Sequence, residues 1–74
     1  MTPSASATQR LAEGVRSTRK ARGLTQRALA ELAGVSRMTI ISVERSAVNV
    51  TLTTLDALAK ALKVDVQELL RPPR

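Results

Sequence analysis

Breaks in the helical pattern are the feature of this 74-residue sequence that most limits its fold. Apolar residues recur at helical spacing, but a glycine or a polar capping residue interrupts each run. Gly23 ends the first run and Gly34 the second, a polar stretch from Ser46 to Val50 ends the third, and Asp65 opens the last. No run is long enough for a parallel four-helix bundle. The pattern therefore predicts an all-α fold of five short helices in an orthogonal bundle.

The expected helices cover about residues 8–22, 25–33, 36–45, 51–62 and 65–70. Residues 1–7 are expected to form a disordered arm, and residues 8–71 a single domain. Thr25, Ser36 and Thr51 are predicted N-caps, and the pairs Ser6 with Gln9 and Asp65 with Glu68 fit capping boxes. The residues expected to point inward are Leu11, Val15, Thr18, Leu29, Ala30, Ala33, Ile40, Val43, Leu52, Leu55, Leu58, Ala59, Leu62, Val66, Leu69 and Leu70.

Composition excludes several ways of stabilising so small a domain. The chain has no Cys and no His, which excludes disulfides and the common zinc sites, and we expect no metal or cofactor. The hydrophobic share is 43% with no aromatic residue, which favours packed helices over a sheet. Stability is therefore expected to come from aliphatic packing, with or without a partner subunit.

The charge balance suggests the kind of partner. Twelve Lys and Arg against six Asp and Glu give a net charge of +6, and a polyanion such as nucleic acid suits that balance. An acidic protein or an anionic lipid would satisfy the same arithmetic. No apolar run approaches the roughly 18 residues of a transmembrane helix, and the N-terminal residues do not resemble a signal peptide. We therefore expect a cytoplasmic protein with no membrane association.

The segment from Leu24 to Ile40 has the pattern of two helices joined by a sharp turn. Gly34 supplies a residue that adopts positive φ easily, and Ala30 and Ala33 are small where crossing helices approach each other. Val35 fits the angle between the two helices. These features describe a helix-turn-helix unit. On spacing alone, an ordinary corner between two helices of a bundle fits as well.

Many residues in this segment and beyond it match one family. The matching residues are Arg19, Gly23, Leu24, Thr25, Gln26, Leu29, Ala30, Ala33, Gly34, Val35, Ser36, Thr39, Ile40, Glu44, Arg45, Asn49, Leu52, Leu55, Leu58, Ala59, Lys60, Ala61 and Leu62. From about residue 11 to residue 70, the chain resembles the phage-repressor-like helix-turn-helix regulators, also called the Cro/repressor or xenobiotic-response-element family. The resemblance implies a five-helix fold with its third helix in the major groove of DNA.

The resemblance also implies which residues contact bases. Arg37, Met38 and Ser42 match base-reading positions, with Thr39 or Ile41 at the flank. Chemically, an Arg at such a position can donate two hydrogen bonds to guanine, and Met can pack on a thymine methyl group. Alternatively, Arg37 contacts a phosphate, Met38 fills a gap, and Ser42 is simply a solvated surface residue.

Other positions are implied to hold the DNA backbone or the fold. The implied phosphate contacts are Thr25, Gln26, Arg45, Asn49, Thr51 and Thr53, although capping alone explains Thr51 fully. In similar proteins, the residues at the positions of Arg19 and Glu44 form a partly buried ion pair between the first and third helices. Some positions depart from the family pattern, namely Thr18, Leu32, Ile41, Ser46 and Val50.

These observations lead to a function hypothesis and one alternative. The hypothesis is a sequence-specific regulator that binds double-stranded DNA as a homodimer on a palindromic operator. A phage repressor, a restriction-modification controller and a toxin–antitoxin regulator all fit. Val64, Val66, Leu69 and Leu70 are candidates for a dimer contact, or else complete the core. The alternative is an interaction module that binds an acidic protein. The acids are scattered and His and Cys are absent, so catalysis is not expected.

Overall fold

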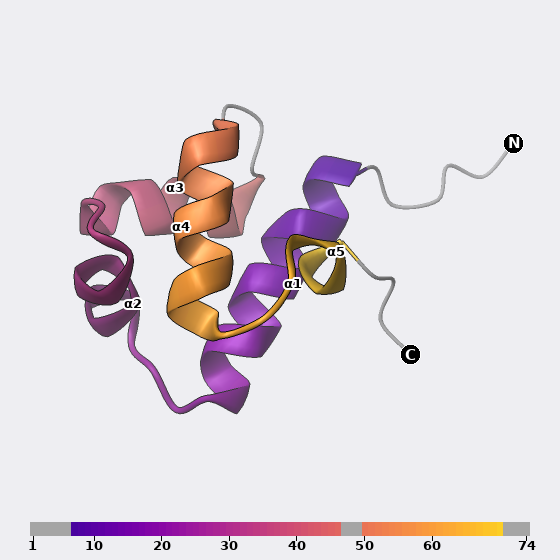
Figure 1. Ribbon diagram of the computed structural model, residues 1–74. Coiled ribbons are helices and arrows are strands. Elements are labelled where there is room, and N and C mark those ends of the chain that lie inside the picture. The colour runs from indigo at the N-terminus through magenta and orange to yellow at the C-terminus, as the bar shows by residue number, and fades with distance from the viewer. Residues whose placement is uncertain (1–6, 47–49, 71–74) are drawn as a thin grey trace, which may run out of the picture.

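Five α-helices and no strand make up the part of the chain that the structure, a computed structural model, describes: residues 7–46 and 50–70 (Figure 1). The helices are α1 (Ala7–Ala21), α2 (Gln26–Ala33), α3 (Arg37–Arg45), α4 (Leu52–Leu62) and α5 (Val66–Leu69). The predicted all-α, five-helix fold is confirmed. Helix α1 begins at Ala7, one residue before the expected boundary of the arm, and the remainder of the arm lies outside the described residues.

Three predicted N-caps are present. The side-chain oxygens of Thr25, Ser36 and Thr51 accept hydrogen bonds from backbone N–H groups three residues later, at 3.0, 3.1 and 3.1 Å. Each bond satisfies a donor that the first turn of a helix leaves free. These caps fix where α2, α3 and α4 begin.

The predicted capping box at Asp65 is wrong. Asp65 occupies the N-cap position of α5, but its side chain makes no capping hydrogen bond. Helix α5 is only four residues long, so docking on its neighbours rather than a cap holds it in place. The other expected box, at Ser6 and Gln9, involves a residue outside the described part of the chain.

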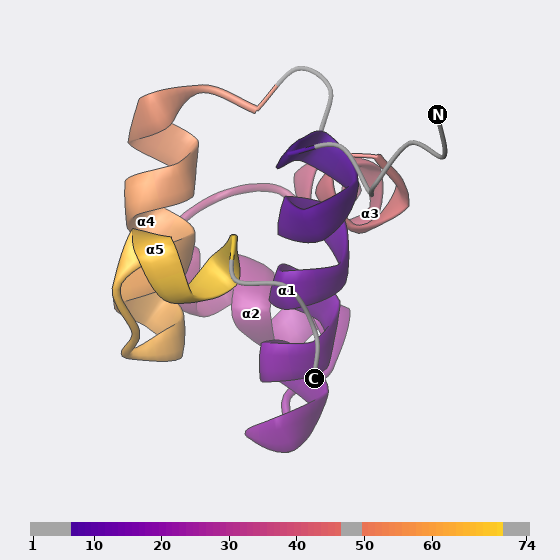
Figure 2. The same cartoon turned by 90° about the vertical axis from the view of Figure 1, so that its right-hand side faces the viewer.

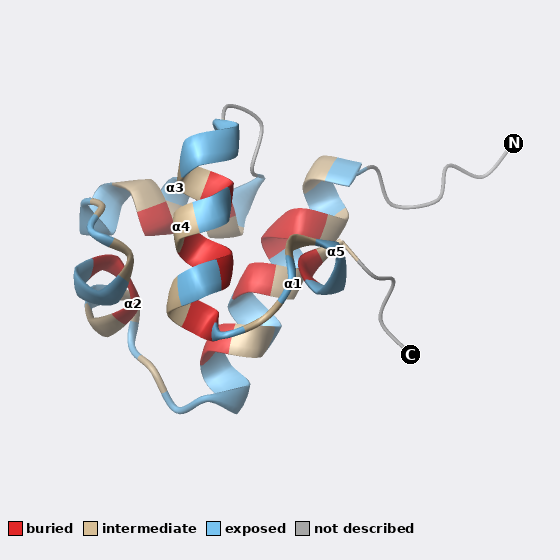
Figure 3. Ribbon diagram, in the orientation of Figure 1, coloured by how far each residue is buried: buried red, intermediate tan, exposed pale blue. Residues whose placement is uncertain are grey.

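The core lies where α1, α3 and α5 meet α4 and α2 (Figure 3). In Figure 1, α4 stands in front of α3, with α2 on one side and α1 on the other. The buried apolar residues are Leu11, Ala12, Val15, Leu29, Ala30, Ile40, Val43, Leu55, Leu58, Ala59, Leu62 and Leu69. All of them are aliphatic, as the composition required.

Some expected core positions are more exposed. Leu52 is wrong as a core residue, because its exposed fraction is 84% and the buried stripe of α4 begins at Leu55. Leu52 is the first residue of α4, and Figure 3 shows this end of the helix extending past its neighbours into solvent. Thr18, Ala33 and Val66 are half-buried.

Helix α5 packs across α1 and α4 (Figure 2), and a glycine makes the contact with α1 possible. A Cβ atom built on Gly14 would overlap the backbone carbonyl of Leu69. The side chain of Leu69 is fully buried. Gly14 therefore lets the last helix approach α1 backbone to backbone, a role that the sequence pattern did not indicate.

Candidate nucleic-acid interface

The turn between α2 and α3 fixes how α3 is presented. Gly34 has φ of 73°, in the left-handed region that glycine adopts without strain. The N–H of Val35 donates to the carbonyl of Ala30 at 3.0 Å, which closes the C-terminal end of α2. Leu29 and Ile40 are fully buried between the helices. The chain thus forms the helix-turn-helix unit predicted from residues 24–40.

Helix α3 buries one side and exposes the other. Its buried residues are Ile40 and Val43. At 100° per residue, the positions away from them form an outward stripe about 140° wide. The residues of this stripe are Arg37, Met38, Ile41, Ser42 and Arg45. The stripe contains four of the five residues predicted to read bases.

The predicted reading residues differ in their availability. Arg37 and Ser42 are exposed, and Met38 has an exposed fraction of 67%, large for an apolar side chain. Ile41 is half-buried at the edge of the stripe. Thr39 is half-buried and lies within the N-terminal cap, where its hydroxyl is 2.9 Å from that of Ser36. Thr39 is therefore the least accessible to a base.

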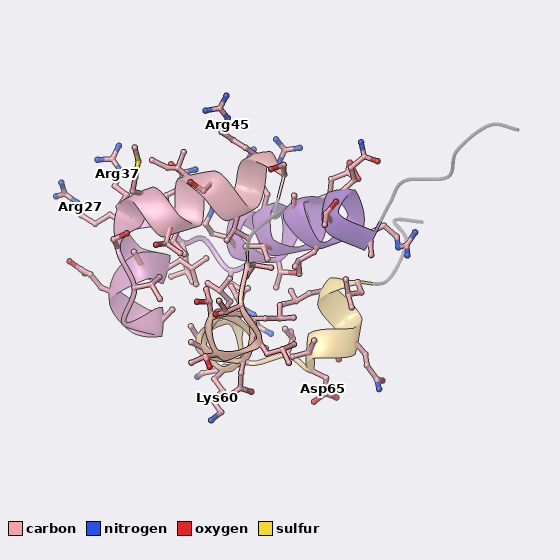
Figure 4. The ribbon with its side chains drawn as sticks, turned by 90° about the horizontal axis from the view of Figure 1, so that it is seen from above. Arg27, Arg37, Arg45, Lys60 and Asp65 are labelled. Carbon is pink, nitrogen blue, oxygen red and sulfur yellow. The ribbon has the colours of Figure 1, made fainter. Side chains whose placement is uncertain are left out.

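Positive charge gathers on the side of the molecule that carries this stripe. Arg27, Arg37 and Arg45 project from one side in Figure 4, whereas Lys60 and Asp65 project from the opposite side. Residues 7–46 hold eight Lys and Arg and three Glu, whereas residues 50–70 hold two Lys and three acidic residues. The net positive charge of the described chain therefore belongs to the α1–α3 half.

Arg27 is a member of this basic side that the sequence reasoning missed. Arg27 is exposed in the first turn of α2 and projects beside Arg37 in Figure 4. The available signal was its position directly after Gln26, at the start of the helix that precedes the turn. The resemblance assigned a DNA contact to Gln26 but none to its neighbour.

The single carboxylate of α3 is turned inward and neutralised. Glu44 accepts hydrogen bonds from Nε and Nη2 of Arg19, at 2.6 and 3.1 Å, and from Nε2 of Gln26 at 3.2 Å. Nη1 of Arg19 donates to the carbonyl of Leu24 at 2.8 Å. The exposed fractions of the Arg19 and Glu44 side chains are 11% and 5%. This Arg19–Glu44–Gln26 network joins three helices and removes negative charge from the stripe.

The residues that the resemblance implies as phosphate contacts differ in exposure and in whether their polar groups already have a partner within the protein. Gln26 is half-buried and its amide nitrogen is bonded to Glu44, so the structure gives it an internal partner. The hydroxyls of Thr25 and Thr51 are engaged in caps. Arg45 and Thr53 are exposed, and Asn49 lies outside the described residues.

The described residues contain neither a candidate metal site nor a candidate membrane-spanning helix. Within residues 7–46 and 50–70, no three His, Cys, Asp or Glu side chains group closely enough to hold a metal ion. In the same part of the chain, no helix has the length and apolar character needed to cross a membrane.

Comparison with known proteins agrees with this geometry. The chain is 55% identical over 60 residues to control protein C.SmaI of Serratia marcescens, a match covering 81% of this chain and 71% of that protein. It is 42% identical over 55 residues to the immunity repressor of Bacillus phage phi105, which covers 74% of this chain but only 38% of the repressor.

Solved structures give the same result. The restriction-modification controller protein C.AhdI of Aeromonas hydrophila superposes with a TM-score of 0.79 at 37% identity, covering 84% of this chain and 94% of that one. The helix-turn-helix family model, HTH_3, matches residues 15–69. The match covers well over half of the sequence and includes the Arg19–Glu44 pair and the whole of α2 and α3. The chain therefore belongs to the HTH_3 helix-turn-helix family.

Proposed function

We propose that this protein is a transcriptional regulator that binds double-stranded DNA sequence-specifically, with α3 in the major groove. The observation that carries the proposal is the exposed stripe of α3, whose two arginines, Arg37 and Arg45, have no ion pair or hydrogen bond within the described chain. The one carboxylate of the helix is meanwhile held by Arg19. A surface of this kind meets a polyanion without an opposing charge.

Within the stripe, Arg37 and Met38 are the residues we assign to base edges. Both are exposed in the first turn of α3, the end of a reading helix that contacts bases in helix-turn-helix complexes. Arg37 can donate two hydrogen bonds to O6 and N7 of guanine, and Met38 can pack on a thymine methyl. Ser42, one turn further, is accessible but short, so it contributes less discrimination. Ile41 contributes at most a flanking apolar contact, because it is half-buried.

The remaining contacts are assigned to the backbone. Arg45 lies eight residues after Arg37, about 12 Å along the helix at 1.5 Å per residue. The major groove is about 12 Å wide, so Arg45 reaches a bordering phosphate when Arg37 is at the bases. Arg27 lies on the same side as both. Gln26 acts through its bond to Glu44. Thr25 and Thr51 contribute their helix N-termini rather than free hydroxyls, and Thr53 contributes its exposed hydroxyl.

The short length of α3 supports a homodimer on a palindromic operator, because one copy reads only a few base pairs. A nine-residue helix is about 13 Å long and covers only about four base pairs at 3.4 Å each. Two copies reading successive turns, about 34–36 Å apart, would double that length. Of the four candidate dimer residues, Leu69 is fully buried and belongs to the core. Val64, Val66 and Leu70 are half-buried, so the dimer contact requires their exposed edges.

Among the possible regulators, we favour a controller of restriction-modification genes. Sequence identity is 55% to control protein C.SmaI and 42% to the phage repressor. The match covers 71% of C.SmaI but only 38% of the repressor. C.AhdI, named as a restriction-modification controller, is covered over 94% of its chain. The family is one of DNA-binding regulators rather than of enzymes.

Selection of bound sequences from random DNA duplexes tests the proposal. We expect enrichment of two inverted half-sites with centres about 10 base pairs apart. The selected duplex should then compete at least about 10³-fold better than bulk random DNA. A preference below about tenfold would favour the alternative, a module of the same fold that binds an acidic protein.

A further inference from the structure

A groove lies between α1 and the C-terminal end of α3, next to the residues of the stripe that are assigned to bases. Its volume is about 360 Å³. The lining residues are Gln9, Ala12, Glu13, Arg16, Glu44 and Arg45. Two helices that are far apart in sequence thus form its walls, and Arg45 makes it continuous with the basic side seen in Figure 4.

Two arginines of this groove are available to a ligand. Arg16 of α1 and Arg45 of α3 are both exposed, and neither forms an ion pair or hydrogen bond within the described chain. Glu44, which also lines the groove, is already neutralised by Arg19. Two arginines that line one groove from separate helices, with one of the nearby acids already paired, form a site suited to a single anion.

We propose that this groove binds one DNA backbone phosphate between Arg16 and Arg45, which extends the DNA interface onto α1. The inference rests on the proposed function, because the phosphate is the one that borders the major groove at the far end of α3. Arg37 would be at the bases while Arg45 lies about 12 Å further along the helix, at the width of the groove. Helix α1 lies outside the major groove, where only the backbone is within reach.

The carboxylate of Glu13 should affect DNA binding in the opposite direction to the two arginines. Its side chain is exposed and lines the same groove, and it has no ion pair in the described chain. A carboxylate beside a bound phosphate repels it. Removing that charge should strengthen DNA binding, whereas removing the charge of Arg16 should weaken it.

The test measures DNA affinity of the full chain as a function of salt concentration, on a selected operator and on random duplex. The slope of log affinity against log salt falls by about 0.9 for each phosphate that the protein no longer neutralises. We expect Arg16→Gln and Arg45→Gln each to weaken binding on both DNAs, and the double variant, in which the phosphate has lost both partners, to lower the slope by about this amount. Arg16→Lys should bind more tightly than Arg16→Gln, since it keeps the charge. Glu13→Gln should tighten binding on both DNAs.

The matched control is Lys60→Gln, which removes the same charge on the opposite side of the molecule (Figure 4). It should leave the slope unchanged. If the two arginines share one phosphate, the loss of affinity in the double variant should be at least about twofold smaller than the product of the single losses.

Three outcomes separate the inference from the proposed function. An unchanged affinity for Arg16→Gln on both DNAs, with specific binding by the wild type intact, overturns the groove site and leaves the function standing. Independent, multiplicative losses for Arg16 and Arg45 overturn the shared phosphate. Absence of any sequence preference in the wild type overturns the proposed function itself. A thermal melt of each variant confirms that its fold is retained.

Discussion

Arg19 and Glu44 lie 25 residues apart in the sequence and form a two-pronged ion pair, with the Nε–Oε2 distance at 2.6 Å. Both side chains are almost entirely removed from solvent. Breaking such a pair leaves a buried charge without its partner, and the cost of that charge is larger than the net contribution of the intact pair. The pair thus holds α3 on α1 and keeps a carboxylate away from the reading surface.

The first prediction concerns this pair. Glu44→Gln should lower the free energy of unfolding by about 3 kcal/mol, because Arg19 stays charged and nearly buried while its carboxylate is gone. Denaturant unfolding followed by circular dichroism measures the change. Glu31→Gln is the matched control, since Glu31 is exposed on α2 with no ion pair in the described chain. Equal stabilities for the two variants would show that the buried pair contributes nothing.

The second prediction concerns Gly14. Gly to Ala inside a helix ordinarily stabilises by about 0.5–1 kcal/mol. Here the new methyl group would overlap the carbonyl of Leu69, so Gly14→Ala should destabilise the protein and displace α5. Ser17→Ala, at an exposed position of the same helix, should be neutral or slightly stabilising. Thermal unfolding of the two variants compares the signs, and a stabilised Gly14→Ala protein would contradict the close α1–α5 contact.

The third prediction concerns Lys63, the C-cap of α4. Its φ is 59°, a left-handed conformation that costs a residue with a Cβ atom but not a glycine. Lys63→Gly should therefore raise the free energy of unfolding by about 0.5–1 kcal/mol. Lys60→Gly, in the last full turn of the same helix, should lower it instead. Chemical denaturation curves of both variants provide the measurement, and a loss of stability in Lys63→Gly would refute the cap geometry.

Local features of the fold were predictable because their causes are local. Thr25, Ser36 and Thr51 cap the helices that follow them, and Gly34 takes the positive φ that the turn requires. A hydroxyl before a helix, or a glycine after one, acts on a few neighbouring backbone groups. Helical spacing likewise identified Ile40 and Val43, which are both buried.

Features that depend on contacts distant in sequence were harder to predict. Leu52 fits the apolar stripe of α4, yet no neighbouring helix reaches its end of the bundle, and the residue is exposed. Gly14 appears as a weak point of a helix until the Leu69 carbonyl is placed beside it. Gln26 was predicted by position to contact a phosphate, which stays a prediction, and the hydrogen bond from its amide nitrogen to Glu44 was not foreseen. The resemblance supplied the Arg19–Glu44 pairing, which periodicity alone could not.

Presentation of Arg37 to base edges by α3 is the central claim, and one affinity matrix tests it most directly. Wild type and Arg37→Ala are titrated against the selected operator and against every single base-pair substitution of one half-site. We predict that Arg37→Ala costs about 1–3 kcal/mol on the operator and abolishes discrimination at one base pair, with the other positions unchanged. Weakening by the same factor on every duplex, random DNA included, would place Arg37 on a phosphate and contradict the claim.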